Sequence, residues 1–237
     1  MPTTALETTI QRLARELSDG QSDELALDLE RWMVASRRFR TFVEAHRQKI
    51  RKKLRTAADA DSRRDVWAEL RAAQLLLADR RIGLAFEAYA ATIGGPDFTV
   101  CLGGSKPFNL EVTRVRGGTG ETWIGGPILA KLRQLPPGIS NALLVAVDGD
   151  DAGAFDVAGD IRGLRARADA KDEAFFTARG FAGSRGFYER FLRLGAVIVW
   201  CDGARDVERA AGWRNPSARI PFPEAAVRAC LAAIRAG

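Results

Sequence analysis

The sequence predicts an α/β fold, in which helices flank a central mixed β-sheet and an N-terminal helical extension precedes it. Three observations support this class. Apolar residues recur at helical spacing through the first third of the chain. A Gly-containing turn joins two strand-like segments, 97–102 and 108–115, and the aliphatic segments 141–149 and 195–203 are typical of buried strands. An antiparallel pair that leads into a strand–helix–strand crossover produces a mixed sheet with helices on its faces.

The helical extension is expected at residues 3–18 and 22–55. The apolar residues expected to pack inward there are Leu6, Ile10, Leu13, Leu17, Leu27, Trp32, Phe39 and Phe42. The stretch 56–64 interrupts the helical pattern. We therefore expect a basic helical region at 1–58 and an α/β domain at 59–237.

The α/β domain is expected to begin with a helix at 62–81, followed by a strand at 82–91 and then the two hairpin strands. The apolar stripe of the first helix is Val66, Leu70, Ala73 and Leu77. The segment 125–138 predicts a helix that Pro127 starts and two prolines stop. Residues 150–194 predict mainly helices, and 221–237 predicts a closing helix.

Composition narrows the functional classes. The three cysteines are scattered and none lies in a CxxC pair, so neither a zinc site nor a disulfide framework is indicated, and a reduced cytoplasmic compartment is expected. The single histidine, His46, excludes a two-histidine metal site. No apolar stretch is long enough to span a bilayer, so no membrane association is expected.

Positive charge is concentrated in one stretch of the chain. The net charge is +6, which permits a polyanionic partner without requiring one. Residues 37–55 are rich in arginine and lysine, and Glu44 is their only acid. Two interpretations stay open: a solvated helical face, or a surface that follows the phosphates of a nucleic acid.

The hairpin at 95–113 carries acids at two positions where a structural hairpin needs none. With the turn at 103–107, we expect Thr99 to lie opposite Glu111 and Asp97 opposite Thr113. Diagonal neighbours on one face lie roughly 7 Å apart, so Asp97 and Glu111 could share a hard cation such as Mg²⁺. Each acid alone has a simpler explanation: turn chemistry for Asp97 and an outward-facing strand position for Glu111.

These residues resemble the motif of a known family. Pro96 and Asp97 at a strand start, Glu111 on the next strand and Glu69 on the preceding helix resemble the PD-(D/E)XK nuclease superfamily, which has the restriction-endonuclease-like fold. The helix and strand expected after the hairpin fall where that fold has its next helix and strand. The resemblance covers roughly residues 63–149, and its motif is short and degenerate.

The resemblance implies roles for several residues. Asp97, Glu111 and the main-chain carbonyl of Val112 would bind Mg²⁺ or Mn²⁺, with Glu69 as an auxiliary carboxylate; such an ion can activate water against a phosphodiester. The simpler alternative for Glu69 is a surface ion pair with Arg71, Arg80 or Arg81.

The chain departs from the family pattern at Thr113, where the motif has lysine. Threonine supplies no positive charge. Lys131, on the helix that follows, could point back at the sheet and replace the missing lysine, whereas Lys106 in the turn lies too far along the hairpin. Thr113 and Gln134 are candidates for positioning substrate or water.

The leading hypothesis is a metal-dependent nuclease-like protein that acts on or binds nucleic acid, either DNA or RNA. A second hypothesis is a catalytically inactive nuclease-fold module for nucleic-acid binding or protein assembly. A third is an interaction protein whose basic helical arm is only a solvated face. Many nucleases of this superfamily act as dimers, so the resemblance also allows a homodimer.

Overall fold

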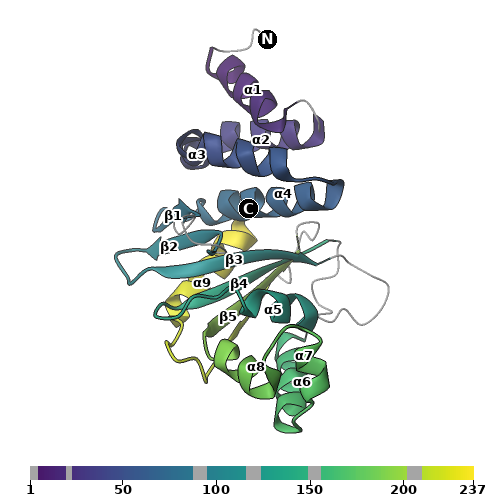
Figure 1. The fold of residues 1–237 in the computed structure, drawn as a ribbon. Helices are drawn as coiled ribbons and strands as arrows, with labels where there is room; N and C mark the ends of the chain where they lie inside the picture. Colours follow the sequence, from purple (N-terminus) through teal and green to yellow (C-terminus); the bar gives the residue numbers. More distant parts are fainter. Residues whose placement is uncertain (1–4, 20–22, 88–94, 116–123, 149–155, 202–209) are drawn as a thin grey trace. The chain divides into compact units, whose positions relative to one another are not determined.

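The computed structural model describes residues 5–19, 23–87, 95–115, 124–148, 156–201 and 210–237. The chain divides into two compact units, residues 1–80 and residues 81–237. Figure 1 shows the helices of the first unit and the sheet and helices of the second. Among the described residues, no helix combines the length and apolarity needed to cross a bilayer.

Helices make up the described part of the first unit. They are α1 (Ala5–Ser18), α2 (Asp23–Ala35), α3 (Arg37–Thr56) and α4 (Ala60–Leu76). Two of them begin at side-chain caps: the Ser36 hydroxyl accepts the Phe39 N–H at 3.2 Å, and the Asp59 carboxylate accepts the Ser62 N–H at 2.7 Å. Trp32 and Phe39 pack edge to face in the core of this unit.

Two leucines predicted to pack inward are exposed. Leu6 is 53% exposed and Leu27 is 65% exposed, whereas Leu25 and Leu29 are buried. Residues four apart on a helix lie on the same side, so α2 buries Leu25 and Leu29 only by turning Leu27 outward. The sequence pattern in α2 fits both choices of face, and tertiary packing decides between them.

The expected boundary between residues 58 and 59 lies one helix earlier than the division at Arg80. Helix α4, which we expected to open the α/β domain, is grouped with the first unit. It contacts α3 there. Its predicted apolar stripe is buried at all four positions.

The second unit is built on a six-stranded mixed sheet. The strands are β1 (Ile82–Phe86), β2 (Phe98–Leu102), β3 (Phe108–Val115), β4 (Asn141–Val147), β5 (Leu194–Cys201) and β6 (Ala210–Arg214). They lie in sequence order across the sheet. The β3–β4 and β4–β5 pairs are parallel, and the other three pairs are antiparallel.

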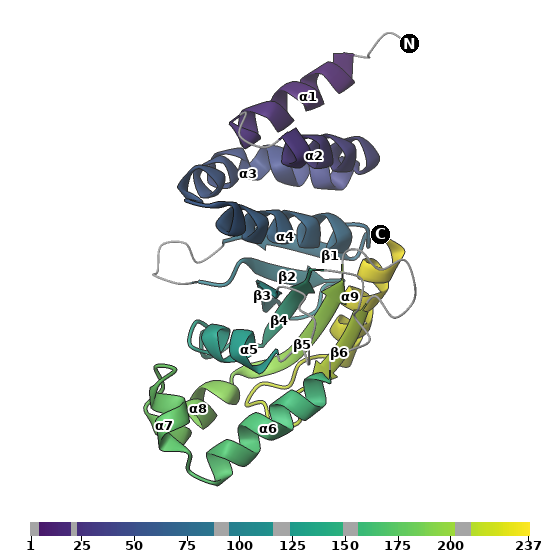
Figure 2. The ribbon, with the colours of Figure 1, turned by 90° about the vertical axis from the view of Figure 1, so that its right-hand side faces the viewer.

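Helices cover both faces of this sheet. They are α5 (Gly125–Leu132), α6 (Val157–Asp169), α7 (Glu173–Thr177), α8 (Gly183–Phe191) and α9 (Glu224–Ala236). Figure 2 shows α5, α6 and α8 on the side of the sheet opposite α9. The predicted α/β class with a mixed central sheet flanked by helices is therefore confirmed, and the restriction-endonuclease-like fold stays a prediction.

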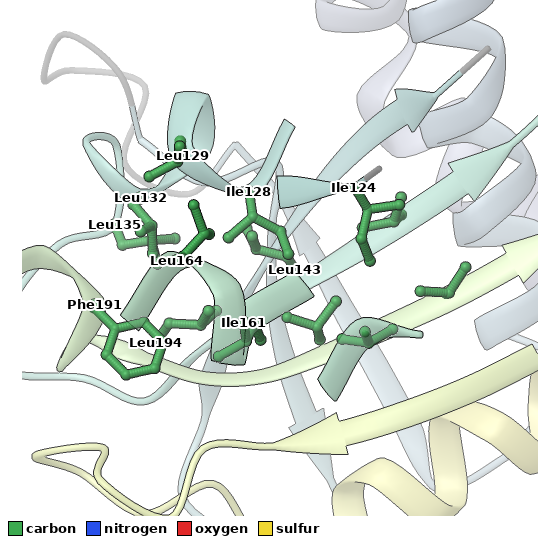
Figure 3. Close-up of a cluster of buried hydrophobic side chains, with 14 of the residues drawn as sticks. Ile124, Ile128, Leu129, Leu132, Leu135, Leu143, Ile161, Leu164, Phe191 and Leu194 are labelled. Atoms are coloured by element: carbon green, nitrogen blue, oxygen red, sulfur yellow. The ribbon is translucent and has the colours of Figure 1, made fainter. Parts of the chain in front are cut away.

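The main core of the second unit lies between the sheet and α5, α6 and α8. Leu143 of β4 and Leu194 of β5 meet Ile128, Ile161 and other apolar side chains there (Figure 3). Continuous aliphatic strands such as β4 have both faces buried, which is why every residue of β4 is buried.

The register of the β2–β3 hairpin differs from the prediction. Thr99 pairs with Asn109, so the expected pairing of Thr99 with Glu111 is wrong by two residues. The last two residues of β2 pair with β1 instead of β3, and Gly103 then turns the chain with φ of 51°. A shift of two residues keeps every side chain on its expected face but changes its neighbours.

Strand β6 was not predicted. Its sequence is AAGWR, and alanine and glycine are depleted in strands. It forms one edge of the sheet and pairs with β5 alone. At the other edge, β1 covers only the first half of the strand expected at 82–91, and residues 88–94 lie outside the described part of the chain.

Candidate active site

Asp97 lies just before β2, beside the middle of β3. Continuing the observed register by one residue places it opposite Glu111, where the expected partner was Thr113. Its Oδ2 accepts the Val112 N–H at 2.9 Å, and its own carbonyl accepts the Glu87 N–H at 2.8 Å. The Asp97 residue is 8% exposed. These bonds hold its carboxylate against β3 at the point where the β2–β3 ladder ends.

Glu111 projects from β3 toward the helix α5. It pairs with Leu143 in the parallel β3–β4 ladder, and Leu143 belongs to the core beneath α5. The residue is only 3% exposed. Its Oε1 accepts a hydrogen bond from Lys131 Nζ at 2.6 Å. Its Oε2 is buried and has no hydrogen-bond donor within the described residues.

Lys131 reaches Glu111 from the last turn of α5. The neighbouring Ile128, Leu129 and Leu132 are buried against the sheet, which fixes the helix and leaves Lys131 at its border. The lysine side chain is 23% exposed, since a lysine can lay its methylene stem along apolar surface while its ammonium reaches a polar group. The structure thus brings together an aspartate, a glutamate and a lysine from three separate segments.

The Val112 carbonyl faces the same edge of β3 as the Val112 N–H. In an antiparallel ladder, a residue that bonds its neighbour does so with both its N–H and its C=O, which point to the same side of the strand. The Val112 N–H is directed at Asp97 Oδ2, so the Val112 carbonyl is directed at the same edge. Two carboxylates and one carbonyl, all oxygen donors, therefore border this site.

The electrostatics of Glu111 follow from this arrangement. Burial and, second, the negative charge of Asp97 raise the pKa of Glu111 from 4.5 to about 6, although Lys131 partly offsets both effects. A buried carboxylate with one orphan oxygen, close to a second carboxylate, is unfavourable for the folded state. Such an arrangement is typical of a functional site.

Of the two residues proposed to position substrate or water, Thr113 lies beside this site and Gln134 does not contact it among the described residues. Thr113 is on β3, on the same face as Glu111, and is partly buried. Gln134 is exposed and lies beyond the end of α5, where its backbone N–H donates to the Lys131 carbonyl at 2.9 Å. The structure gives Thr113 a place beside the site and gives Gln134 no side-chain contact with it among the described residues.

Glu69 belongs to the first compact unit. It is 7% exposed and accepts a hydrogen bond from Lys53 Nζ at 2.5 Å. The sequence alternative named an arginine partner, whereas the structure shows a lysine sixteen residues earlier, on α3. Its auxiliary role at the site stays a prediction.

A buried polar network next to the site was not predicted. The Thr99 hydroxyl donates to Asn109 Oδ1, and Asn109 Nδ2 donates to Asn141 Oδ1, each at 3.2 Å. Asn141 Nδ2 in turn reaches the carbonyls of Pro136 and Arg193. Asn109 and Asn141 are fully buried, so this network ties β2, β3 and β4 together beside Glu111. Asn141 is the first residue of a buried strand, and a polar residue at that position could have indicated the network from the sequence.

The cations of α3 are largely engaged within the first unit. Arg47, Arg51 and Arg55 recur every four residues and face acids at the end of α1. The Arg47 side chain donates to Glu16, and this hydrogen bond holds the pKa of Glu16 below its ordinary value. These pairs favour a structural interpretation of the basic stretch over a surface that follows phosphates.

Comparisons with protein-family models, curated proteins and solved structures found no match to the chain. Within the described ranges, no group of three or more His, Cys, Asp and Glu side chains is gathered as metal ligands usually are. The oxygen donors described above number two carboxylates and one carbonyl, a smaller set that relies on water or substrate for the remaining ligands.

Proposed function

We propose that the chain is a metal-dependent, nuclease-like protein that hydrolyses phosphodiester bonds in nucleic acid. One observation carries the proposal: residues 97, 111 and 131, from separate segments, place two carboxylates and an ammonium group at one point of the sheet. Phosphoryl-transfer sites commonly combine these groups, because the carboxylates hold a cation and the ammonium stabilises charge that develops on phosphate.

The donor set fits Mg²⁺ or Mn²⁺. Asp97, Glu111 and the Val112 carbonyl would be the ligands, and the orphan Oε2 of Glu111 is an oxygen that could coordinate such an ion. When bound, the cation would supply charge stabilisation to a phosphoryl oxygen and a water of lowered pKa. Without it, the two carboxylates face each other with Lys131 as the counter-charge.

The residues of the chain have separate tasks in this proposal. Asp97 is held beside β3 by the Val112 N–H, which places its carboxylate next to Glu111. Lys131 supplies the positive charge that Thr113 does not, and it can move from Glu111 to a phosphate oxygen because its side chain is partly exposed. The Thr113 hydroxyl offers a donor and an acceptor on the same face of β3.

The test is hydrolysis of single- and double-stranded DNA and RNA, with Mg²⁺, with Mn²⁺ and with chelator. We expect metal-dependent cleavage that falls at least about 100-fold in Asp97→Ala, Glu111→Gln and Lys131→Met. Glu224→Gln is the matched control, because Glu224 is an exposed acid on α9, on the opposite face of the sheet. Cleavage that survives in Asp97→Ala and Glu111→Gln would remove this site from consideration.

A second candidate function is a nuclease-fold module that binds nucleic acid or assembles with protein without catalysis. Two observations favour it. Thr113 stands where the motif has lysine, and Glu111 is only 3% exposed to solvent. This candidate predicts binding to oligonucleotides that weakens with salt and no turnover with either metal.

A further inference from the structure

A groove runs along the amino ends of the three parallel strands, away from the acidic site. It consists of two adjoining hollows of about 740 Å³ and about 160 Å³, which share residues 136–139 and Ile220. Phe108 at the start of β3 and Ser140 just before β4 line the larger hollow, and Arg193 just before β5 lines the smaller.

The walls of this groove are apolar and stiff. Prolines border it on three segments of the chain: Pro107, Pro136, Pro137, Pro221 and Pro223. Proline has a fixed φ and little rotamer freedom, so a ligand bound here orders few groups. Ile220 is 39% exposed at the junction of the two hollows.

Three cations border the groove, and none has an acid partner within the ranges that the structure describes. Lys106 lines the larger hollow, and Arg193 and Arg219 line the smaller. No carboxylate forms an ion pair with any of the three within the described residues. Glu189, the acid whose charge reaches Arg193, is bound to Arg185 at 3.2 Å.

Arg193 is the most constrained of these cations. One of its terminal nitrogens donates to the Leu135 carbonyl at 3.2 Å, but its Nε is buried without an acceptor among the described residues. Burial lowers the pKa of Arg193, and the positive charges of Arg190 and Arg219 lower it further. Ser140 adds a second orphan: its Oγ is buried and has no hydrogen-bond partner in the described part of the chain. An anion would relieve the repulsion among these arginines.

This cluster contrasts with the cations of α3. Arg47, Arg51 and Arg55 lie against Glu16 and Asp19, so binding a phosphate there would compete with existing ion pairs. At the groove no such pair has to break. Unmatched positive charge therefore gathers along the groove of the second unit, whereas Arg47, Arg51 and Arg55 of the basic helix are already paired.

We propose that the groove holds the sugar–phosphate backbone of a single-stranded segment of nucleic acid, with Lys106, Arg193 and Arg219 on its phosphates. Arginine matches phosphate with a planar fork of donors, and apolar walls can contact bases only where a duplex does not hide their faces. This inference rests on the proposed nuclease function. It adds the strand state of the substrate and the surface that holds it.

The position of the groove suits that role. Phe108 and Glu111 are three residues apart on β3, which corresponds to roughly 10 Å along an extended strand. Because successive side chains alternate between the faces of a strand, Phe108 and Glu111 point to opposite faces, so a segment seated in the groove must pass the start of β3 to reach the acidic site. The chain between α5 and β4, which contributes residues 136–140 to the groove, also follows the helix that carries Lys131.

The experiment measures binding of the full chain to a short fluorescein-labelled oligothymidylate by fluorescence anisotropy, in chelator and over a range of salt. We expect the double variant Lys106→Gln/Arg219→Gln to bind about tenfold more weakly and to lower the salt slope by about 1.4. Both side chains are exposed, so the fold should hold, and thermal melting checks this.

The matched control is Arg37→Gln/Lys52→Gln on α3, which removes the same two residue types and the same charge from exposed positions. We expect it to bind as the wild type does. An equal loss in both double variants, or no loss in the groove variant, would overturn the inference. So would a poly-glutamate that displaces the oligonucleotide at lower concentration than unlabelled oligothymidylate, because the groove would then suit an acidic protein.

The outcomes also separate this inference from the proposed function. If the groove variant loses binding while no oligonucleotide is cleaved with either metal, the groove stands and the hydrolytic proposal fails. If cleavage depends on Asp97 and Glu111 while the groove variant binds as the wild type does, the hydrolytic proposal stands and the groove inference fails.

Discussion

At the scale of single residues, the buried carboxylate of Glu111 is the feature that most clearly marks the candidate site. It sits in the middle of a strand whose neighbours are aliphatic, and it buries a carboxylate with one oxygen unsatisfied. A residue chosen for stability alone would be apolar at this position. Its position beside Asp97 and Lys131 fits the proposed metal site, and the burial of its carboxylate leads to a thermodynamic prediction.

We expect Glu111→Gln to gain stability relative to the wild type as pH rises. The folded-state pKa of Glu111 is about 6 and its ordinary value is 4.5. The contribution of Glu111 to the free energy of unfolding is therefore fully stabilising below pH 4.5 and is lost as pH rises through 6. Glutamine does not titrate. The difference in the free energy of unfolding should therefore move in favour of glutamine by about 2 kcal/mol across that interval.

Urea denaturation in chelator, at a pH below 4.5 and at a pH above 6, measures this difference. Glu224→Gln serves as control, because Glu224 is exposed and paired with arginines at the surface. A difference between wild type and Glu111→Gln that does not change with pH would mean that Glu111 is not strained in the folded chain.

At the scale of elements, close backbone packing near the bulge between β4 and β5 positions the strands that support the site. A Cβ added at Gly195 would meet Phe222 Cβ at 2.9 Å and the Asn141 carbonyl at 3.1 Å. A Cβ added at Gly83, on the edge strand β1, would meet nothing closer than 3.9 Å. Both glycines lie in strands, so comparing them isolates the effect of the room available to an added Cβ atom.

We expect Gly195→Ala to lower the free energy of unfolding by about 1–3 kcal/mol, because backbone and the Phe222 ring must shift. Gly83→Ala should be neutral or slightly stabilising, since alanine loses less conformational entropy on folding than glycine. Chemical denaturation of both variants checks this. Equal effects at the two positions would show that the β4–β5 region adapts more freely than its packing indicates.

The sequence predicted elements best where local pattern alone determines them. The uninterrupted aliphatic segments of β4 and β5 and the proline-bounded helix α5 appear as expected. The strand β6 was missed because alanine and glycine carry no strand signal. The hairpin register was wrong because the pairing of β2 with β1, not the turn itself, sets where β2 and β3 separate.

The residues of the site, like the elements of the fold, were partly predictable from the sequence. The hairpin pattern led us to expect Asp97 and Glu111 on one face, and the family resemblance suggested Lys131 as the replacement for the motif lysine; the structure brings the three residues together. The partner of Glu69 was not predictable, because Lys53 is on another helix and no local pattern joins them. The asparagine network beside Glu111 also depends on pairing between strands that are distant in sequence.

At the scale of the whole molecule, the two compact units divide the positive charge differently. The first unit carries the most basic stretch of sequence, yet Arg47, Arg51 and Arg55 of that stretch are bound to acids of the same unit. The second unit holds fewer cations in any one stretch but leaves three of them along a groove. Net charge permits a polyanionic partner, and the proposed groove is where such a partner would bind.

The measurement that tests the central claim most directly is titration of the metal-free chain with Mn²⁺ by isothermal calorimetry. We expect one saturable site, loss of affinity of about tenfold or more in both Asp97→Asn and Glu111→Gln, and no change in Glu224→Gln. Proton release should accompany binding near pH 6, because the ion takes the place of the proton on Glu111. Mn²⁺ binding that is unchanged in both site variants, or absent from the wild type, would contradict the account.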